Sequence, residues 1–144
     1  MRFELCLAPT VFLALLASSC VGRDDPPWVG LLNTGKLAIL LDTSDIEDST
    51  TFDRIVLRFD YPEPQLLPDG SGHFTRMYGT WDISCADQVV RDVEIRLDDG
   101  QGKQVGFHRY GTPIWSPWKQ HPASATPFVA ACIRLKYMAA RRGA

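Results

Sequence analysis

The chain has 144 residues, of which 45% are hydrophobic and 22% are charged, and its formal net charge is −2. This composition is typical of a globular domain and too apolar for a disordered chain. The small net charge provides no overall basic field that would recruit nucleic acid or anionic lipid, so no nucleic-acid partner is expected.

The first twenty residues, MRFELCLAPTVFLALLASSC, have the features of a secretory leader. Arg2 places a positive charge near the start, an apolar run extends from Val11 to Ala17, and small residues precede Cys20. The apolar run is shorter than the roughly 20 residues that a membrane-spanning helix needs. Residues 1–19 are therefore predicted to be a signal peptide, and the mature protein is expected to be exported.

Two modes of cleavage remain open for this leader. Cleavage before an acylated Cys20 would give a lipoprotein, whereas ordinary cleavage after small residues would release an unmodified chain. The cysteine at the end of the small-residue run favours the lipoprotein, although Ala17 stands where that signal usually has leucine. Residues 20–35 are rich in proline and glycine and are predicted to form a tether.

The next part of the chain alternates between apolar and polar side chains, which is the pattern of half-buried strands. The alternating segments are Phe52–Tyr61, Phe74–Cys85 and Val89–Leu97. The short apolar run Lys36–Leu41 precedes them. Val105–Tyr110 is expected to be the second strand of a hairpin, after a tight turn at Asp98–Gly102. Short turns between successive strands predict an antiparallel meander of about five to six strands with one solvated face.

The third alternating segment allows its two faces to be assigned. The predicted core side of this strand holds Val89, Val93, Ile95 and Leu97, and the predicted solvent side holds Asp92, Glu94 and Arg96. The solvated face of the sheet is further expected to hold Arg54, Arg58, Arg76 and Arg91. A solvated face of mixed charge is the ordinary interpretation of such a pattern.

The periodicity changes near the C-terminus. Phe128, Cys132, Leu135 and Ala139 recur at three- and four-residue spacing, which predicts a helix with one apolar stripe. Ser124 or Thr126 can cap this helix, and Pro127 is tolerated in its first turn. The cations at its end, Arg134, Lys136, Arg141 and Arg142, are expected to stabilise the helix dipole. The predicted fold is therefore α+β, an antiparallel sheet with a C-terminal α-helix packed on one face.

Two cysteines remain beyond Cys20. Cys85 ends a predicted strand, and Cys132 lies on the buried side of the predicted helix, 47 positions later. In an exported domain such a pair is expected to form a disulfide that holds the helix to the sheet. Closing a loop of this length is worth about 4 kcal/mol in the entropy model. Because a domain has only about 5–15 kcal/mol of stability in total, a structural bond is favoured over a redox role.

An ordered set of short features is similar to the surface-adhesin protein E family of bacterial envelope proteins, from about Trp28 to Ile133. After Trp28 these features are LAILLDTSDIE, IVLRFDYPEPQ, YGTWDISC, VEIRL, WSPWKQHPASATP and FVAAC. The resemblance implies that residues 36–140 form an envelope domain of this family, often as a homodimer. It also implies an adhesin for host matrix and serum proteins, with a basic binding segment at roughly residues 71–96. That segment here holds three arginines against four carboxylates, so the fold is expected to carry over rather than the adhesin activity.

No catalytic constellation is apparent in the sequence. His73, His108 and His121 are scattered over loops and exposed strand positions, without the spacing of metal ligands. No serine lies in a Gly-x-Ser-x-Gly setting. We therefore expect no enzyme, no cofactor and no metal, and a hydrolase would need His73 or His108 to cluster with aspartate and serine side chains.

The candidate partner-binding residues are exposed by pattern. They are Trp115, Trp118 and Tyr110 in and before a proline-containing loop, and Arg76, Arg91 and Arg96 on the solvated face. Aromatic and arginine side chains are favoured anchors at interfaces. The competing interpretation of the two tryptophans is that they close the end of the sheet over the core.

The sequence thus favours a non-enzymatic binding or structural module of the bacterial envelope, an outer-membrane lipoprotein or a periplasmic protein. Its protein partner is unknown, and it would contact the membrane only through an anchor at Cys20. The alternative is a small periplasmic carrier whose sheet and helix enclose an apolar ligand. Room between Leu57, Trp81, Ile83 and Phe128 would favour the carrier, and a filled core would exclude it.

Overall fold

The computed structural model describes residues 27–122 and 124–143, without the side chain of Asp48. The predicted signal peptide, the acylation site Cys20 and most of the predicted tether lie outside these residues. No helix in the described part of the chain is both long and apolar enough to cross a membrane.

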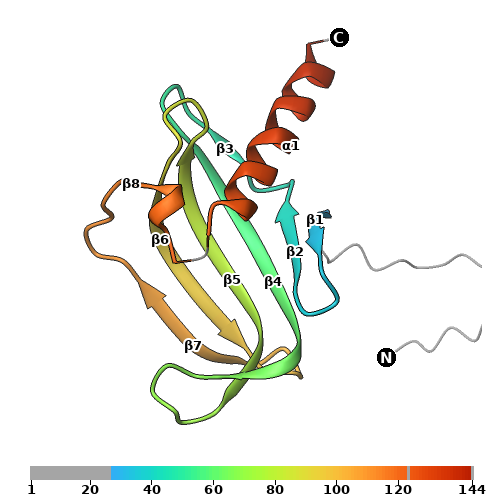
Figure 1. The fold of residues 1–144 in the computed structure, drawn as a ribbon, viewed down its shortest axis with the longest axis vertical. Coiled ribbons are helices and arrows are strands. Elements are labelled where there is room, and N and C mark those ends of the chain that lie inside the picture. Colours follow the sequence, from blue (N-terminus) through green and yellow to red (C-terminus); the bar gives the residue numbers. More distant parts are fainter. Residues whose placement is uncertain (1–26, 123, 144) are drawn as a thin grey trace, which may run out of the picture.

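The described residues form one antiparallel sheet and a C-terminal helix (Figure 1). In chain order the elements are β1 (Trp28–Asn33), β2 (Ala38–Asp42), β3 (Glu47–Asp48), β4 (Asp53–Leu66), β5 (His73–Ser84), β6 (Val89–Asp98), β7 (Gln104–Arg109), β8 (Ser116–Pro117), the 3-10 helix η1 (Trp118–Gln120) and α1 (Thr126–Arg142). The main path of the sheet is β1-β2-β4-β5-β6-β7, with β3 paired to β4 and β8 paired to β6. This arrangement confirms the predicted antiparallel meander with its C-terminal helix.

The core lies between α1 and one face of the sheet. Every second residue of β4, at Ile55, Leu57 and Phe59, is at most 3% exposed on this face. From the helix, Phe128 and Ala131 close the core and are fully buried. The period-two pattern of the sequence therefore assigned the side chains of β4 to the correct faces, because successive side chains of a strand point to opposite faces of the sheet.

The predicted tether is wrong from Trp28 to Asn33, which form the edge strand β1. This strand pairs with β2, and its register shifts between Gly30 and Leu32. Because of this irregularity, Leu31 and Leu32 both pack against the core. The strand does not alternate strictly, and for that reason the sequence pattern did not reveal it.

The predicted faces are also wrong for the first half of β6. Thr80 pairs with Glu94 while the next residue, Trp81, pairs with Asp92, so Val93 is an extra residue in a β-bulge. A one-residue insertion reverses the side-chain alternation before it. Consequently Val90, and not Val89, is fully buried, and Asp92 points to the helix side of the sheet.

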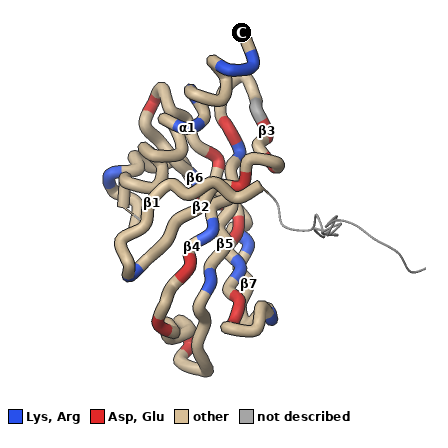
Figure 2. Tube along the Cα trace, turned by 90° about the vertical axis from the view of Figure 1, so that its right-hand side faces the viewer, with Lys and Arg blue, Asp and Glu red and all other residues tan. Residues whose placement is uncertain are grey.

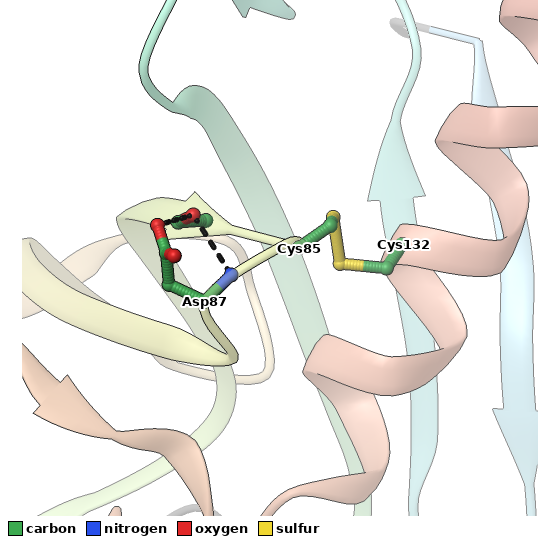
Figure 3. The surroundings of a disulfide bond; sticks show 4 residues. Cys85, Asp87 and Cys132 are labelled. Atoms are coloured by element: carbon green, nitrogen blue, oxygen red, sulfur yellow. Dashed lines mark hydrogen bonds between the residues drawn. A yellow bond between two sulfur atoms is a disulfide. The ribbon is translucent and has the colours of Figure 1, made fainter.

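The predicted disulfide is confirmed. Cys85, directly after β5, is bonded to Cys132 in α1, with an S–S distance of 2.00 Å and a Cα–Cα distance of 5.7 Å (Figure 3). Beside it Ser84 Oγ donates a hydrogen bond to the carboxylate of Asp87 (2.7 Å) and accepts one from the Asp87 backbone N–H (3.3 Å). These bonds hold the β5–β6 turn at the point where the disulfide fastens the helix to the sheet.

Candidate functional site

The face of the sheet opposite α1 carries a half-open groove with a volume of about 510 Å³. Three arginines and three acidic residues line it, together with aromatic side chains from three strands. The lining residues used below are Arg58, Arg76, Arg96, Trp28, Tyr78 and Phe107. Figure 2 shows both basic and acidic positions along the strands of this face. The groove is therefore polar but balanced in charge.

The centre of the groove is a cross-strand row that we call the arginine–aromatic row, made of Arg58, Tyr78, Arg96 and Phe107. Tyr78 on β5 pairs with Arg58 on β4 and with Arg96 on β6, and Arg96 pairs with Phe107 on β7. Side chains at paired positions lie on the same face at about the strand spacing of 4.8 Å. Cation and aromatic thus alternate across four neighbouring strands.

Stacking fixes the side chains of this row. The guanidinium carbon of Arg96 lies 4.0 Å from the centre of the Tyr78 ring. On the other side Tyr78 lies 5.9 Å from the ring of Trp28, and Arg58 lies 4.9 Å from that same Trp28 ring. Each cation–π contact contributes about 0.5–2 kcal/mol, more where water is excluded. Trp28, on the edge strand, therefore extends the row to the border of the sheet.

Carboxylates accept hydrogen bonds from the guanidinium groups of the same arginines. Asp60 accepts hydrogen bonds from Arg58 Nε (3.1 Å) and Arg76 Nε (2.7 Å). The hydrogen bond from Arg76 to Asp60 raises the pKa of Arg76, although partial burial opposes this. Arg96 donates to the almost buried Asp98 (3.2 Å), while Arg96 Nε and Asp98 Oδ1 are 3.1 Å apart without the alignment of a hydrogen bond. Each of the three arginines is therefore held by a carboxylate, with Asp60 shared by Arg58 and Arg76.

A second ion cluster lies beside the groove on the same face. The Asp82 carboxylate is 0% exposed and accepts 2.7 Å hydrogen bonds from Arg54 Nε and Arg91 Nε. Burial alone would raise the pKa of Asp82, but the two arginines together hold it below its usual value. Arg91 in turn lies over the rings of Phe52 (5.0 Å) and Trp115 (4.8 Å). Through these ion pairs and ring contacts, the cluster connects β4, β5, β6 and the loop before β8.

On the helix side, a buried polar contact involves the bulged strand. Trp81 Nε1 donates a 2.8 Å hydrogen bond to Asp92 Oδ1, and His121 Nε2 lies 2.9 Å from the same oxygen. The side chain of His121 is only 7% exposed, and its ring packs edge-on against Phe128 (5.1 Å). The expectation that His121 is a surface residue is therefore wrong, because its imidazole satisfies a carboxylate under the helix.

The six residues predicted to bind a partner are divided among several places. Arg76 and Arg96 lie in the groove, and Arg91 and Trp115 lie in the neighbouring ion cluster. Trp118 is 5% exposed and belongs to the core, so the expectation that it is exposed is wrong. Tyr110 lies on the helix side, 4.6 Å from His108 between ring centres, and burial followed by the Asp92 charge raises its pKa.

Four of these groove residues, Trp28, Arg58, Tyr78 and Phe107, were not among the six predicted candidates. The alternation of β5 could have placed Tyr78 on the solvated face, but only the register shows that it lies between two arginines. Trp28 was noted only as the first feature of the family resemblance, because its segment was not recognised as a strand. Side chains from six strands form the groove, and the turn pattern predicted that successive strands are neighbours but not the register that brings these particular side chains together.

The pocket that would favour a carrier is filled. Leu57, Trp81, Ile83 and Phe128 are at most 1% exposed, and the Trp81 and Phe128 rings pack 5.7 Å apart. A half-open hollow of about 440 Å³ lies elsewhere, next to β6 and β7. Its apolar lining includes Leu67, Ile95, Leu97 and Tyr110.

The histidines and carboxylates form no recognisable catalytic or metal arrangement within the described residues. No group of three or more His, Cys, Asp and Glu side chains in this part of the chain could hold a metal ion. His108 faces Tyr110, and His73 lies exposed at the first position of β5. Neither histidine has a serine hydroxyl among its hydrogen-bond partners in the structure.

Comparison of the chain with models of known protein families finds no match, and comparison with curated proteins finds no relative. The fold and the groove define a class of protein, a one-disulfide α+β domain with a charge-balanced, aromatic groove on its open sheet face. Membership of the surface-adhesin protein E family remains a prediction from the order of short sequence features.

Proposed function

We propose that this protein is a non-enzymatic binding module of the bacterial envelope, and that its ligand lies along the arginine–aromatic row. The observation that carries the proposal is the alternation of Arg58, Tyr78, Arg96 and Phe107 across four strands at the floor of a groove. Such a concave surface, with polar groups fixed by stacking and ion pairing, is preorganised for binding.

The chemistry of the groove favours a neutral oligosaccharide. Asp60 and Asp98 already pair the three arginines, so a polyanion would have to displace these carboxylates. Guanidinium and carboxylate groups together offer many donors and acceptors to the hydroxyl groups of a sugar. Phe107, which is 52% exposed, adds an apolar surface at one end for the C–H face of a sugar ring. Binding of a protein in the groove instead of a sugar would favour the adhesin activity that the family resemblance implies.

Binding of the mature protein to neutral and acidic oligosaccharides, measured on an array and then by calorimetry, tests this proposal. We expect binding to a neutral chain that changes little with salt, because no net charge is neutralised. Phe107→Ala should weaken it, whereas Leu66→Ala, which removes another exposed apolar side chain outside the groove, should not. Binding restricted to acidic chains, or lost equally in both variants, would contradict the proposal.

We also propose that the protein is exported and anchored by acylation of Cys20, following the leader pattern of residues 1–20. The intact mass of the protein purified from its own membranes provides the test. A chain that begins at acylated Cys20 and lacks two hydrogens for the disulfide is expected. An unmodified chain in the soluble fraction would leave a periplasmic protein and remove the anchor.

The filled core excludes a ligand held between the sheet and α1, but a different hollow makes the carriage of a small apolar ligand a second candidate function. The hollow lined by Leu67, Ile95, Leu97 and Tyr110 is apolar and opens beside the filled core. Native mass spectrometry of the purified protein would detect a retained apolar molecule. If the Leu97→Asn variant no longer retains this molecule but still binds the oligosaccharide in the groove, the two functions are separate.

A further inference from the structure

The outer face of α1 carries an exposed apolar stripe. Val129, Ile133 and Tyr137 follow one another at four-residue spacing and are 40%, 65% and 47% exposed. The opposite side of the helix, with Phe128, Ala131 and Cys132, is buried against the sheet. Helical residues four apart lie above one another on one face. The stripe therefore faces away from the core and is left uncovered within the described chain.

The stripe continues onto the edge strand. Between α1 and β1 lies a shallow depression of about 420 Å³, whose lining includes Ile133 and Tyr137 from the helix and Gly30 and Leu31 from the strand. Figure 1 shows α1 beside β1, with the last turns of the helix projecting beyond the sheet. The apolar surface is thus broader than one helix and lies where the N-terminal part of the chain joins the fold.

The same helix holds a distinct set of cations. It contains Arg134, Lys136, Arg141 and Arg142 and no acidic residue. None of these four forms an ion pair with a described residue, whereas Arg54, Arg58, Arg76, Arg91, Arg96 and Arg109 of the sheet all do. The guanidinium groups of Arg134 and Arg141 lie 5.4 Å and 4.9 Å from the ring centre of Tyr137. Arg134 and Arg141 therefore border the apolar stripe, whereas Lys136 and Arg142 line a hollow with Asp53 on the sheet side of α1.

We propose that the outer face of α1, from Val129 to Arg142, rests on an anionic lipid surface. A helix with an apolar stripe bordered by cations is suited to the interface of such a membrane, where apolar side chains enter and cations meet the headgroups. The small net charge of the chain does not oppose this contact, because the acidic side chains of the sheet are largely paired on the other face. The proposal goes beyond ligand binding in the groove and does not depend on it.

The position of the predicted anchor agrees with this orientation. Eight positions separate Cys20 from Trp28, a span of at most about 28 Å if extended. An acyl chain at Cys20 would hold β1, and with it α1, close to the membrane. The open face of the sheet, with its groove, lies on the other side of the molecule and would remain accessible.

A second copy of the chain is the competing occupant of this stripe. Two helices packed through Ile133 across a two-fold axis would bring two sets of four unpaired cations together, and such like-charge contacts disfavour association. Lipid headgroups instead supply the anions that the protein does not. The test distinguishes the two occupants directly.

Co-sedimentation of the mature chain carrying Cys20→Ser, which cannot be acylated, with lipid vesicles tests the proposal. We expect binding to vesicles of phosphatidylglycerol and phosphatidylethanolamine, loss of binding at high salt, and little binding to phosphatidylcholine alone. Each surface cation contributes about fivefold to such binding. Arg134→Gln with Arg141→Gln, the two cations beside the stripe, should therefore weaken it about 30-fold.

Lys36→Gln with Lys103→Gln is the matched control, because it removes the same charge from exposed turns away from α1. It should bind vesicles almost as the parent chain does. Ile133→Asn should weaken binding without changing its salt dependence, and unchanged denaturation midpoints would show that all variants are folded. Absence of binding, equal binding to neutral vesicles, an equal loss in the control, or a dimer in solution that Ile133→Asn dissociates would each overturn the proposal.

Discussion

The indole ring of Trp81 lies directly over the backbone of Gly79, two residues earlier on the same face of β5. A Cβ atom built on Gly79 would overlap three carbon atoms of the six-membered ring. The ring is 1% exposed and contacts Phe59 and Phe128 edge-on, so it cannot move aside without disturbing the core. The absence of a side chain at Gly79 thus leaves the space that the Trp81 ring occupies.

Gly79→Ala is expected to destabilise the protein by about 3 kcal/mol, the upper part of the range for overpacking a core, because the Trp81 ring must shift. The midpoint of urea unfolding gives this value. Gly30→Ala is the control, since a Cβ atom there meets nothing within 4 Å. Equal stability of the two variants would show that the ring can repack at little cost.

Removal of the disulfide should have a larger effect. With 47 positions between Cys85 and Cys132, reduction or the double change to alanine should lower the free energy of unfolding by about 4 kcal/mol. Urea unfolding of the oxidised protein, with and without reductant, measures the difference. The double alanine variant should not respond to reductant, and an unchanged midpoint for the reduced parent protein would contradict a structural role.

Asp82 should link stability to acidic pH. Because its pKa in the folded protein is below the usual value, its ion pairs contribute fully above about pH 4. That contribution is lost as the pH falls from this value through the lowered folded pKa. Asp82→Asn should cost about 3 kcal/mol at neutral pH, because it leaves Arg54 and Arg91 without their shared carboxylate.

Urea midpoints from neutral to acidic pH provide the measurement for Asp82. The difference between the parent protein and Asp82→Asn should shrink as the pH falls. Asp69→Asn is the control, because hydrogen bonds from Ser71 also lower the pKa of Asp69, but this carboxylate lies on an exposed loop. A pH-independent difference for Asp82→Asn would show that the carboxylate contributes through packing rather than charge.

The two tryptophans of the loop and η1 should behave differently. Trp118→Ala should cost about 3–5 kcal/mol, because it opens a cavity in the core. Trp115→Ala removes ring contacts with Arg91 and Phe52 at a partly exposed site and should cost about 1 kcal/mol. Chemical denaturation of both variants is the measurement. Similar losses would mean that Trp115 also closes the core.

The elements that could be predicted were those with an uninterrupted pattern. The alternation in β4 and β5 placed Arg58 and Asp82 on one face and Leu57 and Trp81 on the other, as the structure confirms. The spacing on α1 identified Phe128 and Cys132 as buried. These predictions succeeded because a regular strand or helix fixes the direction of each side chain from its position in the chain.

The errors occurred where one extra residue interrupts a strand. Val93 in β6 reversed the faces of the preceding residues, and the register shift near Gly30 hid β1. Propensities do not show where a bulge occurs, because the ladder on the neighbouring strand determines which residue is left unpaired. The burial of His121 was missed for a related reason, since its partner Asp92 was assigned to the wrong face.

The sequence by itself determined the period of each regular element, the pairing of Cys85 with Cys132 and the class of the fold. These depend on local alternation and on the presence of only two cysteines after residue 20. Only the tertiary structure decided which side chains are neighbours across strands. The register places Arg58 and Arg96 on either side of Tyr78, and the docking of α1 leaves Ile133 uncovered. The groove is formed by residues distant in the chain, whose proximity depends on strand register, whereas the stripe on α1 is local in sequence and its exposure depends on how the helix packs on the sheet.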